Sequence, residues 1–285
     1  MKIYLRNENK IENIKDQKPL IFLYKTKLGR IILKVITLPI FSKVFGLIID
    51  TRISTIYINR FIKNNNIDMT RFEKIKYSSF NDFFTRKVNN TRPEKTYEQN
   101  VLISLCDAKL TAYEISDELT IKVKNSVYNM ENLINEKVKS EYQGGKCLVF
   151  RLCPDDYHRY HAFDDYEIIK RKKIKGRLHT VNPISYDSYQ VFKENQREVS
   201  LLKTKKFKNV YQIEVGALNV GKIKNTNKKE LKKYEEKGYF LFGGSTIILL
   251  FQKDVIKLDE DIEKYSKQNI EVKINYGEKI GVKHE

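Results

Sequence analysis

The pattern of apolar and polar positions changes near residue 28. Residues 1–27 form a polar lead whose short alternating pieces, residues 2–5 and 20–24, predict edge strands. Residues 28–66 place apolar side chains at helical spacing with lysines among them, which predicts amphipathic helices. Because proline lacks the N–H that a helix interior needs, we expect Pro39 to divide them. Such helices can lie in a membrane interface or pack on the protein's own core, and the pattern favours neither.

From residue 101 onward, apolar positions alternate with polar ones or form short blocks, which predicts β-strands. The expected strands are residues 101–105, 110–115, 119–123, 146–152, 166–174, 210–215, 240–242, 247–251 and 270–274. Residues 128–138 predict a short helix, and the charged residues 222–237 predict a solvated loop or a helix end. The chain is therefore expected to be α+β, with a helical amphipathic N-terminal region, residues 1–95, and a largely antiparallel β body, residues 96–285.

Positive charge is concentrated at the N-terminal end. The chain has 54 Lys and Arg against 36 Asp and Glu, a net charge of +18, and residues 1–90 hold 18 of these basic residues against 7 acidic ones. A basic surface attracts nucleic acid or anionic lipid, although codon bias toward Lys, Ile and Asn can give the same excess. We expect no signal peptide, and no stretch reaches the ~20 apolar residues of a spanning helix.

The histidines are the first candidates for chemistry, because imidazole exchanges protons near neutral pH. His158 and His161 are three residues apart, and His179 follows closely. Asp155, Asp156 and His179 could complete a metal site around the first two, but we expect no metal, and ordinary structural histidines are the other interpretation. The cysteines, Cys106, Cys147 and Cys153, are odd in number and lack Cys-x-x-Cys spacing, so we expect neither a disulfide framework nor a zinc site.

Ser245 lies between two glycines and an apolar run. Glycine permits backbone conformations that other residues resist, which matters if the hydroxyl attacks the carbonyl of Gly244. A tight turn into a strand is the alternative. A serine nucleophile needs a base and the base needs an orienting partner, and His161 and Asp107 could supply these.

Several motifs, in family order over residues 68–255, resemble the phosphatidylserine decarboxylase family. They are Phe80-Asn81-x-Phe83-Phe84-x-Arg86 with Arg92-Pro93, Cys106-Asp107, Tyr157-His158-Arg159-x-His161, Gly176-x-Leu178 with Asn182-Pro183, Val215-Gly216-Ala217 and Gly243-Gly244-Ser245-Thr246. Two positions depart from the family pattern. Ala108 replaces a usual glycine, and Gly243 stands where many members have Leu or Phe.

The resemblance implies an enzyme that cuts its own chain between Gly244 and Ser245. Asp107, His161 and Ser245 would form a charge relay, in which His161 takes the serine proton and Asp107 orients the imidazole. Attack on the Gly244 carbonyl converts the amide to an ester, and elimination releases the Gly244 carboxylate. Hydrolysis of the resulting dehydroalanine releases ammonia and leaves a covalent pyruvoyl cofactor at Ser245. The products would be a β chain, 1–244, and an α chain, 245–285, which we expect to stay associated.

By the same resemblance, the pyruvoyl group forms a Schiff base with phosphatidylserine, releasing CO₂ and giving phosphatidylethanolamine. We expect His158 to handle the proton in this decarboxylation. A lipid substrate implies a peripheral enzyme on the cytoplasmic side of the cell membrane. Residues 1–95 would associate with the anionic membrane and residues 96–285 would be catalytic, with no nucleic-acid partner.

Three alternatives stay open on the sequence. The scaffold could serve another pyruvoyl-dependent decarboxylation. The chain could be a non-enzymatic basic protein that binds membranes or nucleic acid and stays uncut. It could also be a family member that folds without maturing, for which Ala108 is the only support.

Overall fold

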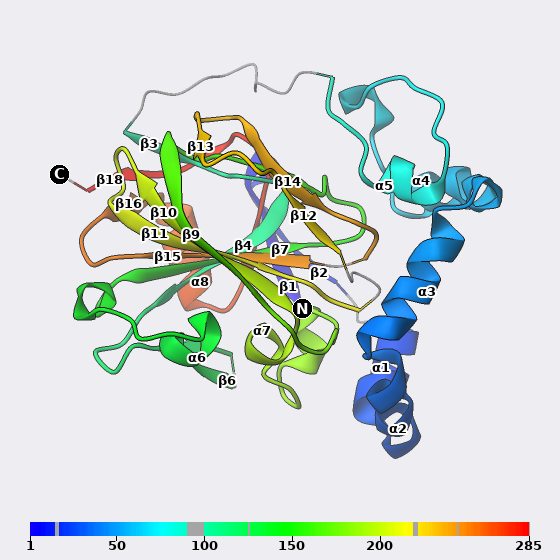
Figure 1. Cartoon of the computed structure of the whole chain (residues 1–285), viewed down its shortest axis with the longest axis horizontal. Helices are drawn as coiled ribbons and strands as arrows, with labels where there is room; N and C mark the ends of the chain where they lie inside the picture. Colours follow the sequence, from blue (N-terminus) through cyan, green and yellow to red (C-terminus); the bar gives the residue numbers. More distant parts are fainter. Residues whose placement is uncertain (15–16, 90–99, 125, 219–221, 244, 285) are drawn as a thin grey trace.

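A ten-stranded sheet forms the centre of the protein (Figure 1). The computed structural model describes residues 1–14, 17–89, 100–124, 126–218, 222–243 and 245–284. Neighbouring strands of the sheet are antiparallel except β1 and β17, which run parallel. In spatial order the strands are β13 (Glu230–Leu231), β9 (Tyr166–Ile174), β10 (Arg197–Thr204), β11 (Asn209–Val215), β15 (Ser245–Phe251), β7 (Lys146–Leu152), β4 (Ala108–Glu114), β17 (Glu271–Ile274), β1 (Lys2–Leu5) and β2 (Lys10–Asn13).

Strand β15 lies inside this sheet, between β11 and β7. All seven of its residues are buried, as expected of a strand that is covered on both faces and therefore reads as a continuous apolar run. Its side chains alternate between two apolar cores. Ile247 and Leu249 belong to the core on one face, and Ile248 and Leu250 belong to the core on the other.

Smaller elements complete the β body. Helices α6 (Met130–Ile134) and α7 (Val191–Glu194) pack into the core that holds Ile248, and α8 (Glu260–Lys267) packs into the other. The smaller sheets are β12 (Ile223–Asn225), β14 (Glu236–Phe240) and β8 (Arg159–His161); β16 (Ile256–Leu258), β18 (Lys279–Lys283) and β3 (Val101–Ile103); and β5 (Thr120–Val123) with β6 (Ser126–Asn129).

Helices near the N-terminus lie along one side of the β body (Figure 1). They are α1 (Lys18–Lys25), α2 (Lys27–Ile36), α3 (Pro39–Ile49), α4 (Ile58–Asn64) and α5 (Phe80–Phe84). Pro39 is the first residue of α3, where a backbone N–H would have no partner within the helix. The predicted division at Pro39 is confirmed, and α2 and α3 meet at 73°. The buried rings of α5 fasten this region to the body, because Phe80 and Phe84 both contact Phe242.

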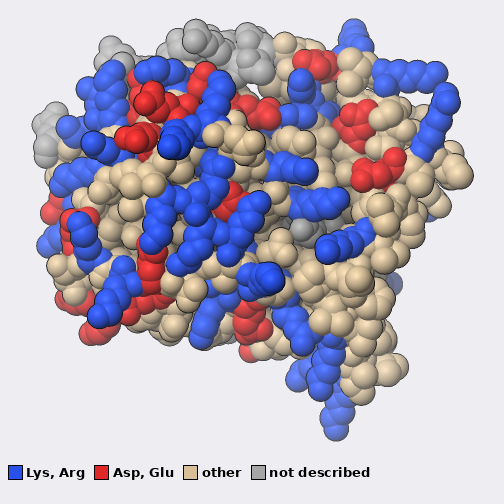
Figure 2. All heavy atoms as spheres, viewed as in Figure 1, with Lys and Arg blue, Asp and Glu red and all other residues tan. Residues whose placement is uncertain are grey.

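The outer faces of α2 and α3 are apolar and exposed. Leu28, Ile31, Leu47 and Ile48 each expose 59–69% of their surface. Among the described residues, no single helix is long and apolar enough to cross a membrane. Taken together, the bent pair α2–α3 has the length and the composition of a membrane-crossing segment. Figure 2 shows this mainly uncharged flank beside a face crowded with Lys and Arg.

Some predicted elements are wrong. Residues 20–24 are helical, because Pro19 lies in the first turn of α1 and Tyr24 packs into a cluster with Leu33. Residues 2–5 form a strand but not an edge, since β1 lies between β17 and β2. Residues 222–237 contain β12, β13 and the start of β14, where Lys237 is fully buried in an ion pair with Glu214.

The α+β class is confirmed: helices near the N-terminus precede a mostly antiparallel β body. The proposed boundary at residue 95 lies outside the described residues, so the division into two regions stays a prediction.

Candidate active site

Ser245 opens β15 opposite Leu152 of β7. Its side chain is fully buried, and its Oγ makes no hydrogen bond with the described residues. Gly243 has a φ of 131°, a conformation that only glycine adopts without strain. Gly244, the other residue of the predicted cut, lies outside the described residues. The structure thus presents a buried serine hydroxyl two residues after a glycine with a positive φ.

His158 lies near the same glycine. Its carbonyl accepts a hydrogen bond from the N–H of Phe240 (3.0 Å), and its ring packs on Phe84 at 4.1 Å between centroids. Nδ1 is 2.9 Å from the carbonyl oxygen of Asp156. A carbonyl only accepts, so Nδ1 carries the proton and Nε2 keeps its lone pair. Nε2 is buried and makes no hydrogen bond with the described residues.

Burial lowers the pKa of His158 to about 3, while the nearby backbones of Asp156 and Gly243 favour protonation. The ring is therefore neutral at physiological pH.

His161 is held on both ring nitrogens. Its Nδ1 is 3.0 Å from the carbonyl oxygen of Tyr234 and donates to it, so Nε2 accepts from the Tyr157 hydroxyl at 3.2 Å. The ring stacks on Tyr276 with a centroid distance of 4.1 Å. Burial lowers the pKa of His161 to about 4. His161 is thus neutral, and its basic nitrogen is already in use.

Asp107 precedes β4 and is almost fully buried. Its carboxylate accepts a hydrogen bond from the N–H of Tyr276 (2.7 Å) and forms an ion pair with Arg71 (3.1 Å). Tyr276 therefore contacts both Asp107 and His161, through its backbone and its ring. The N–H of His161 also donates to the carbonyl of Leu105, two residues before Asp107.

The three predicted relay residues gather at one end of the sheet. Strand β7 separates β4 from β15, so the backbones of Asp107 and Ser245 lie about 10 Å apart at the usual strand spacing. Among the described residues no hydrogen bond joins Asp107, His161 and Ser245 to one another. The structure brings these residues into one region, and the relay itself stays a prediction.

Arg86 is a residue at this site to which the sequence reasoning gave no role. It is 2% exposed and lies between the rings of Phe72 and Phe83. Its Nη2 donates to the carbonyl of Asp155 and, at 3.4 Å, to the Asp156 carbonyl that also binds His158. The Phe-Phe-x-Arg motif pointed to this arginine, but no sequence pattern indicates that its partners are backbone carbonyls.

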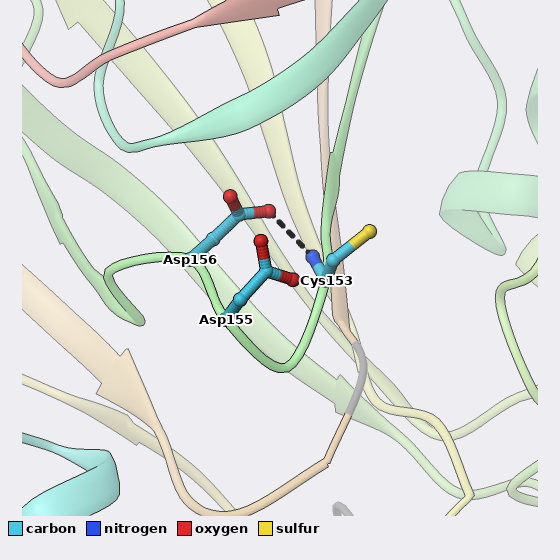
Figure 3. Close-up of side chains that lie close together, drawn as sticks. All are labelled: Cys153, Asp155 and Asp156. Carbon is cyan, nitrogen blue, oxygen red and sulfur yellow. Dashed lines mark hydrogen bonds between the residues drawn. The ribbon is translucent and has the colours of Figure 1, made fainter. Parts of the chain in front are cut away.

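Cys153, Asp155 and Asp156 form the group of potential metal ligands in the described structure (Figure 3). Their ligand atoms lie within 4.8 Å of one another. Asp156 already binds Lys109 (2.7 Å) and the N–H of Cys153 (2.7 Å). Because a lysine neutralises this carboxylate, the arrangement fits a structural ion pair better than a cation site. His179, considered as a further ligand, instead stacks on Tyr189.

An apolar groove of about 550 Å³ opens beside the site. Phe45, Ile48, Phe61 and Phe242 are among its lining residues. The ring centroids of Phe242 and Phe84 are 4.9 Å apart, and the Phe84 ring packs on His158. The groove therefore ends about one aromatic ring away from the histidine.

A buried serine hydroxyl and neutral buried histidines at the same end of the sheet are the residue types of a serine nucleophile and its base. These residue types are typical of enzymes that use an activated hydroxyl. Comparison with known families narrows this class.

The chain belongs to the phosphatidylserine decarboxylase family, whose model matches residues 80–282. It is 53% identical over 262 residues to phosphatidylserine decarboxylase proenzyme 2 of Clostridium acetobutylicum, covering 91% of this chain and 90% of that protein. The proenzymes of Clostridium tetani and Clostridium botulinum strain Hall are 41% and 42% identical, over 96% and 98% of this chain and 94% and 99% of those proteins.

Proposed function

We propose that this protein is the proenzyme of a phosphatidylserine decarboxylase, which cuts itself before Ser245 and converts phosphatidylserine to phosphatidylethanolamine. The observation that carries the proposal is the fully buried side chain of Ser245, which follows Gly244, opens β15 and has an Oγ that makes no hydrogen bond with the described residues. Family membership supports the reaction, and the relatives' printed names support a precursor form.

Ser245 fits the position of a pyruvoyl group. Its side chain is buried at the start of an apolar strand, and its hydroxyl has no hydrogen bond with the described residues that the conversion would break. The group would supply a carbonyl that takes up the substrate amine and accepts the electron pair left by CO₂. The buried rings of Phe84, which packs on His158, and of Tyr157, which contacts His161, would help to exclude water from the site.

Two histidines can move the protons that both stages need. The resemblance assigns His161 to the self-cleavage and His158 to the decarboxylation. His158 is the one whose Nε2 is unpaired in the described structure, whereas the Nε2 of His161 accepts from Tyr157. For His161 to take the serine proton, it must first give up that bond.

We also propose that the enzyme works as a peripheral protein on the anionic, cytoplasmic leaflet. The exposed apolar faces of α2 and α3 support this placement, because such faces enter the head-group boundary of a bilayer. The apolar groove at Phe242 would then receive acyl chains from the same side. The mature β and α chains would remain together as one enzyme.

The deciding experiment is the intact mass of the purified, denatured protein beside a Ser245→Ala variant. Two fragments, 1–244 and 245–285, are expected for the natural sequence, with the smaller one blocked at its N-terminus. The variant should remain a single chain of 33.8 kDa. A natural chain that stays uncut after folding would contradict the proposed chemistry, and release of CO₂ from phosphatidylserine vesicles then tests the substrate.

A further inference from the structure

A basic groove lies on the face of β9, β10 and β12. Its volume is about 370 Å³, and four lysines line it: Lys173, Lys175, Lys222 and Lys224. We call these four residues and the cavity between them the basic groove. Figure 2 shows Lys and Arg gathered across this face, beside a flank that is uncharged over much of its surface and basic at its lower tip.

The charge of the basic groove is not balanced by its own residues. Glu198 is the acid in its lining, and this buried carboxylate already binds Arg171 (3.4 Å), Lys173 (3.6 Å) and the amide of Asn225 (2.9 Å). Lys175, Lys222 and Lys224 form no ion pair with the described residues. A concave surface lined by one sign of charge concentrates ions of the opposite sign.

The basic groove is attached to the apolar helices. Directly after its lysines, Arg177 donates to the carbonyl of Lys34 in α2 (2.9 Å), and the N–H of Leu178 donates to Thr37 (2.9 Å). Lys222 also lines a small cavity against α3, together with Lys43. If α2 and α3 enter the head-group boundary, the basic groove lies at the level of the lipid phosphates.

We propose that the basic groove binds the phosphate-bearing head group of an anionic phospholipid that is not the molecule being turned over. The proposal rests on the membrane contact proposed above for α2 and α3. It commits to a lipid because Arg177 and Lys222 connect the groove to α2 and α3, whose exposed apolar faces a nucleic acid or a free phosphate would leave uncovered. The β body, and not only the N-terminal helices, would thus select anionic membranes.

The test is a charge-reversal variant, Lys173→Glu/Lys175→Glu/Lys224→Glu, assayed by sedimentation with phosphatidylcholine vesicles with and without phosphatidylglycerol. Lys222 is left unchanged because it packs against α3. Each lysine near an anionic surface contributes about 1 kcal/mol, so we expect at least about a tenfold loss of the binding that depends on phosphatidylglycerol. Binding to pure phosphatidylcholine should stay the same.

The matched control is Lys253→Glu/Lys257→Glu/Lys267→Glu, at and near β16 and α8 on the side of the body away from α2 (Figure 1). It changes the net charge equally and should retain most of the binding. Equal losses in both variants would show a general charge effect and overturn the proposal, as would no loss in the groove variant. Stronger binding of the natural protein to duplex DNA than to anionic vesicles would also overturn it.

Two further readouts separate this proposal from the proposed function. Self-cleavage and turnover of soluble, short-chain phosphatidylserine should be unchanged in the groove variant, because no groove lysine lies at Ser245 or His158. A fall in either would place the groove in the catalytic machinery and overturn the inference. An uncut natural protein would instead defeat the proposed function, while the vesicle comparison would still be decisive for the groove.

Discussion

His158 and His161 have the same chemistry but different nitrogens available. Both are neutral and buried, yet Nε2 is unpaired in His158 and accepts from Tyr157 in His161. Their motif is visible in the sequence, whereas the partners are not. The groups that fix the two tautomers are the carbonyls of Asp156 and Tyr234, and a backbone carbonyl is present whatever residue stands there. Sequence reasoning therefore found the candidate residues without finding which nitrogen is free.

The variants His158→Gln and His161→Gln separate the two roles. If His161 is the maturation base, as the resemblance implies, its variant should stay uncut, and the His158 variant should be cut but lose at least about 100-fold in decarboxylation. Intact mass and CO₂ release measure the two steps. An uncut His158 variant that retains the native fold by circular dichroism would assign the first proton transfer to the unpaired nitrogen instead.

The same histidines make stability depend on pH. Their pKa values fall from the ordinary 6.5 to about 3 and about 4 on folding, so the unfolded chain binds more protons below pH 6.5. Their contribution to the free energy of unfolding is complete above pH 6.5 and is lost as the pH falls toward 3. Each contributes up to about 1.4 kcal/mol per pH unit in this window.

Urea unfolding of the Ser245→Ala precursor between pH 7 and pH 4.5 checks this dependence. The precursor is the right material because it remains a single chain. A second precursor that also carries His158→Gln should show a shallower decline over the same range. Identical declines would mean that other groups control the acid sensitivity.

At the scale of elements, periodicity predicted some long strands and missed another, β10, which has eight residues and lies inside the large sheet. Strands β7 and β9 have the predicted bounds, since apolar blocks and alternation mark them clearly. Strand β8 was missed because its three residues follow a loop and carry Arg and His, and its place is set by pairing with β14. Short elements depend on distant partners, which a local pattern does not contain.

The expected α chain supplies two separate strands to the large sheet. Strand β15 pairs with β11 and β7, and β17 pairs with β4 and β1. We therefore expect the two fragments to co-elute in size-exclusion chromatography after the cut and to separate only in denaturant. Co-elution should persist in high salt, because apolar burial rather than surface charge holds these strands in the sheet. Separation by salt alone would contradict this account.

At the scale of the whole molecule, basic side chains and exposed apolar helix faces lie on the same side of the protein. Lys34 and Lys43 lie among the exposed apolar residues of α2 and α3. Composition predicted the basic N-terminal region, but not that lysines of β9 and β12 would adjoin it, because that neighbourhood arises only from tertiary folding.

Reversal of both charges, Lys34→Glu/Lys43→Glu, should weaken sedimentation with anionic vesicles by about 1 kcal/mol or more per residue. The exposed pair Lys137→Glu/Lys139→Glu, next to α6, is the matched control and should change little. Raising the ionic strength should reduce the difference between the two variants, since salt screens exposed charges. Unchanged sedimentation of the first variant would remove these lysines from the membrane contact.

The residues of the candidate site come from segments far apart in the chain. Asp107 precedes β4, His158 adjoins β8 and Ser245 opens β15, and they approach one another only when the large sheet has formed. In a chain that cuts itself, the cut would occur only in molecules that have folded, and it would remain after they unfold. A misfolded molecule would remain whole, and the proportion of cut chains on a denaturing gel would count native molecules long after the event.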